Sequence, residues 1–174
     1  PQLSYHKMDP HAPASMGVYF FVGGVDWEKY ESFKEEHKEL SEEDLKWENE
    51  VLKPYESKFG YRLFAFEGPR YVHIIPFIRK DWESGEFKIV RTIEGVGPVV
   101  IGELEQGPDD GMAQARTFKT IGPDPGNGLH ISKIEAEIRM HIFETVQFWK
   151  RHVPGFENAY VLCIAPFIGS RGGP

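Results

Sequence analysis

The stretch "SKIEAEIRMHIFETVQFWKRHVPG", residues 132–155, carries the clearest periodicity in the chain. Its large apolar side chains recur at steps of four, four, four and three residues, which places them on one face of an α-helix. Ser132 with Glu135 has the pattern of a capping box, and Pro154 with Gly155 is typical of a helix end. The sequence therefore predicts a long amphipathic helix whose buried stripe consists of Ile134, Ile138, Ile142, Val146 and Trp149.

A strand and two further helices are predicted before this helix. The apolar run "MGVYFFVGG", residues 16–24, has the length and composition of a buried strand. Asp26 is placed to cap one helix and Ser41 to cap the next. Because Pro54 has no amide proton to donate, we expect the second of these helices to end or kink near Lys53.

Short β-like runs separated by turn residues fill the region between residues 61 and 121. Short connections of this kind favour antiparallel pairing. Pro76 is expected to place the second run at a sheet edge or a bulge. The runs cover residues 61–66, 71–78, 87–93, 98–104 and 113–121, whereas residues 1–15 are expected to be extended and residues 122–128 to form a loop.

These segments together predict an α+β fold. We expect a mostly antiparallel sheet, with the long C-terminal amphipathic helix and two N-terminal helices packed on it. The 174 residues, 40% of them hydrophobic, suffice for one core, so residues 1–174 are interpreted as a single domain.

Composition and charge narrow the classes of function. The formal net charge is −7, which argues against nucleic-acid binding, and the acidity comes from residues 26–50, most simply as solvated helix faces. No apolar run approaches the roughly 20 residues of a membrane span, and no signal peptide is visible. Cys163 is the only cysteine, which excludes an intrachain disulfide and favours a cytoplasmic location. Its apolar neighbours predict a buried, unreactive thiol.

The chain lacks a recognisable nucleotide-binding motif. "GVGPVV", residues 95–100, has Val100 where a dinucleotide fingerprint needs its third glycine, and it is interpreted as a turn. His141 and His152 are three helical turns, or about 16 Å, apart, too far to share a metal ion. We expect both to lie at the surface or its boundary, and His73 and His130 to have structural roles.

The last segment, "APFIGSRGGP", places a glycine-rich loop directly after a predicted buried strand. Ser170 lacks the spacing of a nucleophile elbow. Arg171 has a guanidinium group that can bind a carboxylate through two hydrogen bonds, and the neighbouring glycines permit close backbone approach and positive φ angles. Arg171 is therefore the candidate for ligand binding.

Two segments resemble FAD-dependent oxidoreductases of the group that includes the fumarate reductase and succinate dehydrogenase flavoproteins. "HIFETVQFWKRHVPGFENAYVLCIAPFIGSR", residues 141–171, is similar to that group's long helix ending in V-P-G-F-E-N-A, its following strand and its G-V-R-E-S-R-R loop. "MGVYFFVGGVD", residues 16–26, resembles the strand that begins the group's middle domain. The two segments cover about 40 of the 174 residues.

The resemblance implies that the chain is the middle, substrate-binding or capping domain of such an enzyme and is inactive alone. It implies hydride transfer between FAD and a small, carboxylate-bearing substrate, with FAD bound mainly by a separate domain of the same full-length chain or by a partner subunit. Arg171 matches the loop's first arginine and is the expected catalytic residue, and Gly169 and Ser170 are the expected cofactor contacts. Ser170 replaces the usual valine, and Gly172, Gly173 and Pro174 also depart from the loop pattern.

Two alternative functions remain open from the sequence. The first is a non-catalytic binding or subunit-interaction module of the same descent. The second is an interaction domain whose acidic helices, within residues 26–50, recruit a basic partner. The absence of an initial methionine before Pro1 leads us to expect a processed or excised piece of a longer protein.

Overall fold

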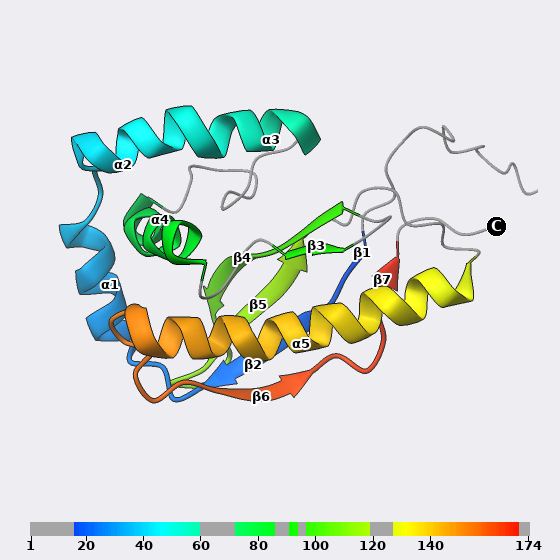
Figure 1. Ribbon diagram of the computed structural model, residues 1–174. Helices are drawn as coiled ribbons and strands as arrows, with labels where there is room; N and C mark the ends of the chain where they lie inside the picture. Colours follow the sequence, from blue (N-terminus) through cyan, green and yellow to red (C-terminus); the bar gives the residue numbers. More distant parts are fainter. Residues whose placement is uncertain (1–15, 60–71, 86–90, 94–96, 119–126, 171–174) are drawn as a thin grey trace, which may run out of the picture.

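A computed structural model describes residues 16–59, 72–85, 91–93, 97–118 and 127–170. Its main feature is a five-stranded sheet with the order β3-β4-β5-β2-β6, in which every paired strand is antiparallel. The strands are β2 (Tyr19–Gly23), β3 (Arg91–Ile93), β4 (Gly97–Gln106), β5 (Ala113–Phe118) and β6 (Tyr160–Ile164). Strands β1 (Met16–Gly17) and β7 (Gly169–Ser170) form a separate antiparallel pair. The predicted α+β class with an antiparallel sheet is confirmed (Figure 1).

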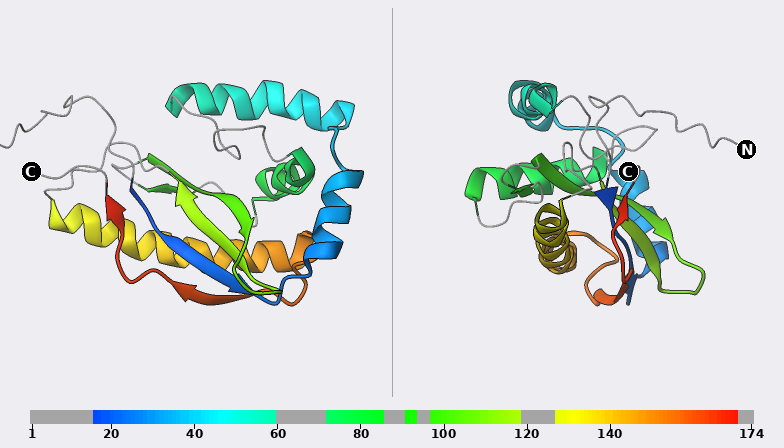
Figure 2. Two further views of the ribbon diagram at one scale, coloured as in Figure 1. Left: turned by 180° about the vertical axis from the view of Figure 1, so that it is seen from behind. Right: turned by 90° about the vertical axis from the view of Figure 1, so that its right-hand side faces the viewer.

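The long helix α5 (Gly128–His152) runs across one face of the sheet (Figures 1 and 2). All members of the predicted stripe are buried, and Trp149 stacks on Phe20 of β2 with ring centroids 6.2 Å apart. The helix begins four residues before the predicted cap, because the Asn127 side chain accepts hydrogen bonds from the backbone N–H groups of Leu129 and His130. Residues 127–128 therefore belong to the helix start and not to the predicted loop.

The two predicted N-terminal helices begin where expected. Helix α1 (Trp27–Glu36) starts after Asp26, whose carboxylate accepts a hydrogen bond from the Lys29 N–H. Helix α2 (Glu42–Trp47) starts after Ser41, whose hydroxyl oxygen accepts a hydrogen bond from the Asp44 N–H. Both are side-chain caps of the kind that satisfies the open donors of a first turn.

The expected end of the second helix near Lys53 is wrong, and in place of an end or a kink the helix changes its geometry there. It continues through the π-helical turn η1 (Glu48–Leu52) into α3 (Lys53–Phe59), and the three segments form one rod in Figure 1. The Lys53 N–H donates to the Glu48 carbonyl, five residues back, as a π turn requires. This wider turn directly precedes Pro54 and accommodates a residue that cannot donate to the helix.

The strand predicted over residues 71–78 is also wrong. This segment forms the 3₁₀ turn η2 (Val72–Ile74) and helix α4 (Ile75–Ser84), which ends at Gly85 with a φ angle of 70°. Pro76 lies in the first turn, where an amide proton is not needed. Ile74, Ile75 and Ile78 are all buried, and their spacing fits one face of a helix. Their β-branched side chains, in contrast, suggest a strand.

The other predicted strands correspond to β3, β4 and β5 where the structure describes them. Residues 1–15, 61–66, 87–90, 119–126 and 171–174, on which further predictions fall, lie outside the described residues.

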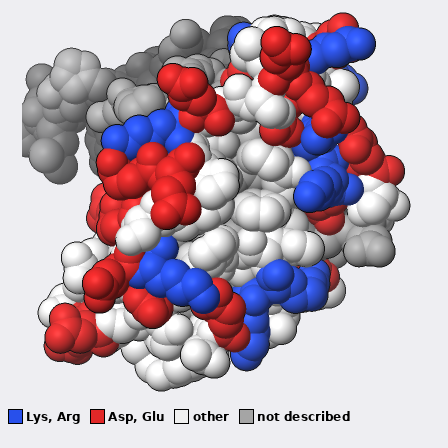
Figure 3. All heavy atoms as spheres, turned by 90° about the vertical axis from the view of Figure 1, so that its left-hand side faces the viewer, with Lys and Arg blue, Asp and Glu red and all other residues white. Residues whose placement is uncertain are grey.

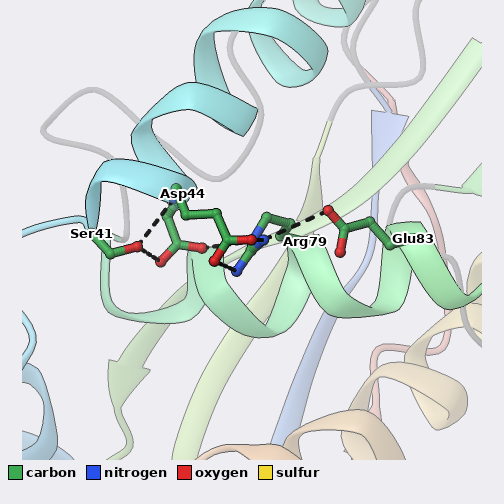
Figure 4. Close-up of polar contacts among 5 residues, drawn as sticks. Ser41, Asp44, Arg79 and Glu83 are labelled. Carbon is green, nitrogen blue, oxygen red and sulfur yellow. Dashed lines mark hydrogen bonds and ion pairs between the residues drawn. The ribbon is translucent and has the colours of Figure 1, made fainter.

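Helices α2 and α4 are joined by ion pairs centred on Arg79 (Figure 4). The Arg79 Nε atom lies 2.8 Å from Asp44 Oδ1, and Nη1 lies 2.7 Å from Glu43 Oε1 and 3.7 Å from Glu83 Oε1. Asp44 is buried and also accepts a hydrogen bond from the Ser41 hydroxyl. The hydrogen bond to Glu43 is the main cause of the raised pKa of Arg79. This network fixes α2 against α4.

Candidate functional site

The two ends of the described chain meet where β1 and β7 pair. Met16 lies opposite Ser170, and Gly17 lies opposite Gly169. Gly169 is exposed, its backbone is not in the left-handed region, and an added Cβ would lie 3.5 Å from the Gly17 carbonyl oxygen, an ordinary contact. Of the loop's glycines, Gly169 therefore does not use the positive φ that glycine permits. Arg171 and the remaining glycines lie outside the described residues.

The strand that leads to this pair is not buried as predicted. β6 lies at the edge of the sheet, and Cys163 is exposed. Only Val161 and Ile164 of β6 are packed partly against the core, because a strand at an edge has neighbours on one side only. The expectation of a core thiol is therefore wrong: an apolar run in the sequence does not distinguish an edge strand from a central one.

The segment 153–159, "VPGFENA", links α5 to β6 and packs against the start of α1. Gly155 has a φ angle of 90°, and an added Cβ would lie 2.5 Å from the Asp26 carbonyl oxygen. Its own carbonyl accepts a hydrogen bond from the Asp26 N–H at 2.8 Å. Val153, Phe156 and Ala159 are buried. This glycine is thus required by positive φ and by close backbone approach.

Glu157 and Asn158 complete this connection. One Glu157 carboxylate oxygen accepts a hydrogen bond from the Gly155 N–H, and the other pairs with Lys29 of α1. The Lys29 hydrogen bond is the main cause of the lowered pKa of Glu157. An added Cβ at Gly24 would lie 2.3 Å from the Asn158 carbonyl oxygen. The two segments that resemble flavoproteins, 16–26 and 141–171, therefore contact each other, and these motif residues have structural roles.

The turn from β2 into α1 does not fit a flavin pyrophosphate, although it joins a strand to a helix through two glycines. The Asp26 carboxylate occupies the helix N-terminus, where a phosphate group would otherwise bind. The N–H groups of Val25 and Asp26 donate to the carbonyls of Gly111 and Gly155. The described residues of this turn thus offer no phosphate cradle, so any FAD contact requires residues elsewhere.

A polar hollow lies on the sheet face opposite α5, close to β1. Arg116 of β5 is the register partner of Tyr19 of β2, and its Nη1 donates to the Tyr19 hydroxyl at 3.0 Å. The guanidinium carbon lies 5.9 Å from the centre of the Tyr19 ring. Glu105, Gln114 and Ala115 complete the lining of a shallow, solvent-open hollow.

Sequence reasoning missed this hollow. The available signal was the alternation in "AQAR", residues 113–116, where the polar Gln114 and Arg116 alternate with the buried Ala113 and Ala115. Alternation identifies the outward side chains, but it does not reveal that Tyr19 is the partner of Arg116, since this depends on pairing between distant strands.

The histidines have mainly structural surroundings. His73 Nε2 lies 3.0 Å from the buried Tyr30 hydroxyl, and burial, followed by the charges of Lys34 and His37, lowers the pKa of His73 to about 4. This agrees with the structural role predicted for His73, although it lies in a turn and not in a strand. His141 is fully buried in α5, which corrects its predicted place near the surface.

The acidic helices are interspersed with basic side chains. Figure 3 shows both charges side by side across the end of the molecule formed by α1, α2 and α4. Lys34 pairs with Glu31, Lys38 with Glu35, and Arg79 with Glu43. The charge pattern favours a solvated surface over a uniform acidic patch for a basic partner.

Within the part of the chain that the structure describes, no three His, Cys, Asp or Glu side chains gather in a way that could hold a metal ion. No described helix is long and apolar enough to cross a membrane. No family model, curated protein or solved structure matches the chain.

Proposed function

We propose that this chain is the substrate-binding or capping domain of an FAD-dependent oxidoreductase of the fumarate reductase and succinate dehydrogenase flavoprotein group. The observation that carries the proposal is the β1–β7 pair. When a domain is inserted into another domain, the chain must enter and leave the inserted domain at nearby points. The antiparallel pairing of Met16–Gly17 with Gly169–Ser170 meets that requirement. The resemblance places this domain between two parts of an FAD-binding domain.

The contact between the two resembling segments supports the same proposal. Segments 16–26 and 141–171 are far apart in the chain, yet β2 pairs with β6, and Asp26 hydrogen-bonds to Gly155. A resemblance carried by segments that form one structural unit is more specific than two isolated matches. Because these residues stabilise the fold, their similarity indicates a shared domain type, and the chemistry depends on the loop that follows β7.

In this proposal Arg171 binds a substrate carboxylate, because it directly follows β7, from which the chain would pass toward the FAD-binding domain. A flavin bound mainly by the other domain would supply hydride transfer to or from the substrate. Gly169 and Ser170 border the cofactor. The capping domain excludes water from the reacting atoms.

The decisive experiment compares the 174-residue chain with the polypeptide encoded by its whole reading frame. We expect the longer protein to show a flavin absorbance spectrum and substrate-dependent flavin reduction, and the 174-residue chain to bind no FAD. In the longer protein, Arg171→Ala is expected to lower kcat/KM by about a hundredfold or more. The matched control is Arg151→Ala, which removes an exposed arginine at the C-terminal end of α5.

Two results would overturn the proposal. A complete reading frame that yields a protein without bound flavin would favour the non-catalytic module of the same descent. A flavoprotein whose KM and kcat are unchanged by Arg171→Ala would remove the proposed role of Arg171.

A further inference from the structure

The hydroxyl group of Tyr19 is held at a fixed place on the sheet face opposite α5. Tyr19 lies on β2, which pairs with β5 on one side and with β6 on the other. The neighbouring Phe20 stacks on Trp149 of α5, so Tyr19 points to the opposite face. Its hydroxyl lies 3.0 Å from Arg116 Nη1, and its carbonyl accepts a hydrogen bond from the Ala165 N–H. Both its backbone and its side chain are therefore positioned before any ligand arrives.

The hydrogen bond between Tyr19 and Arg116 leaves the hydroxyl proton available. A guanidinium group can only donate, so the Tyr19 oxygen is the acceptor in this bond and its own proton must be donated elsewhere. Among the described residues, no acceptor lies within hydrogen-bond distance of that hydroxyl. Donation from a cation also polarises the O–H bond, which makes the hydroxyl a stronger donor. Because Tyr19 is 47% exposed, an oxygen atom of a ligand can reach this proton.

The surroundings of Tyr19 indicate which oxygen this is. Tyr19 follows β1 after two residues, and β5, which carries Arg116, also contacts β1 (Figure 1). In the proposed function the chain passes between the two domains at β1 and β7, so Tyr19 would border the substrate. Glu105 lines the same shallow hollow, and its negative charge disfavours a second anionic group there. A neutral carbonyl oxygen is therefore the acceptor that fits.

We propose that the Tyr19 hydroxyl donates a hydrogen bond to a carbonyl oxygen of the substrate, and that Arg116 is its positioning residue. The inference rests on the proposed function and narrows the substrate class to small acids that carry a carbonyl group besides the carboxylate. The hollow is open to solvent, so a single hydrogen bond made there competes with water. We expect the bond to add measurable affinity only where the FAD-binding domain covers this face and excludes water.

A pair of matched probes tests the inference in the protein encoded by the whole reading frame. Pyruvate and propionate have the same carbon chain and carboxylate, and only pyruvate has a carbonyl oxygen. Both are titrated into the protein, and the change in flavin absorbance gives each dissociation constant. Pyruvate is expected to bind about tenfold more tightly than propionate. Tyr19→Phe should abolish this preference, whereas Tyr160→Phe, at a tyrosine that is 53% exposed on β6, should preserve it.

Substitutions of Arg116 separate positioning from a merely structural role. Arg116→Met removes the donor to Tyr19 and is expected to lower the preference for pyruvate, whereas Arg116→Lys can still donate and is expected to retain most of it. A structural role would change both dissociation constants alike. A flavin spectrum that responds to neither probe, equal affinities of the unmodified protein, or a preference that survives Tyr19→Phe overturns this inference and leaves the proposed function standing. A longer protein without flavin overturns both.

Discussion

The buried pair of His73 and Tyr30 makes the stability of the fold sensitive to mild acid. Burial holds the pKa of His73 at about 4, compared with an ordinary value of 6.5 in the unfolded chain. Between these two values the unfolded state binds the proton and the folded state does not. The contribution of His73 to the free energy of unfolding is therefore fully present above pH 6.5. It decreases as the pH falls from 6.5 to 4, and below pH 4 it decreases no further.

The pKa difference sets the size of the effect. A difference of about 2.5 units at about 1.4 kcal/mol per unit gives a total loss of about 3.5 kcal/mol, with about 2 kcal/mol of it already lost at pH 5. The side chain is only 7% exposed, so solvent screening does not reduce this value greatly. The loss is a large fraction of the free energy of unfolding of a whole domain, which is typically about 5–15 kcal/mol.

Urea unfolding followed by tryptophan fluorescence measures this effect between about pH 7.5 and pH 4.5. The variant His73→Gln is expected to lose less stability on acidification than the unmodified chain, so the difference between them changes by about 2.5 kcal/mol over this pH range. Carboxylates that titrate in the same range contribute to both proteins and cancel. His152→Gln, at an exposed position, serves as the control. Parallel pH profiles for His73→Gln and the unmodified chain would refute the reasoning.

Two further predictions concern stability and use the same unfolding assay. Arg79→Met leaves the buried Asp44 carboxylate without its cation and is expected to lower the free energy of unfolding by about 3 kcal/mol. The control Arg151→Met, at an exposed site, should lower it by less than about 0.5 kcal/mol. Equal losses in the two variants would contradict the role of the α2–α4 network. Gly155→Ala adds a methyl group 2.5 Å from the Asp26 carbonyl oxygen and is expected to cost about 3 kcal/mol or more. Gly85→Ala also has a positive φ but meets nothing within 4 Å, so about 1 kcal/mol is expected; a similar cost at both glycines would show that backbone approach at Gly155 is unimportant.

The sequence was sufficient where a local pattern and the tertiary structure require the same residues. The stripe from Ile134 to Trp149 had only to face the sheet, and Asp26 and Ser41 cap helices through hydrogen bonds that span three residues. These features depend on helical geometry alone. They were predicted correctly because no distant contact competes with them.

The incorrect predictions arose where local preference and packing differ. The β-branched residues before Pro76 suggest a strand, but their burial together on one helix face decides the structure. Cys163 lies in an apolar run whose exposure depends on its edge position in the order of the described strands. Arg116 meets Tyr19 only through pairing across 97 positions of the chain. Such contacts are not encoded within any window of the sequence.

The central place of β2 has a consequence for how the protein is made. β2 is among the first described segments to leave the ribosome, but its two neighbours are β5 and then β6, near the end of the described chain. A sheet built from such distant pairings has a high contact order, and its formation is slow because long loops must close first. Until β6 is synthesised, β2 has an open edge in a nascent chain, and its apolar residues are exposed to aggregation. We therefore expect the sheet to form only after β6 has been synthesised, and this domain to depend on chaperones more than a helical bundle of its size.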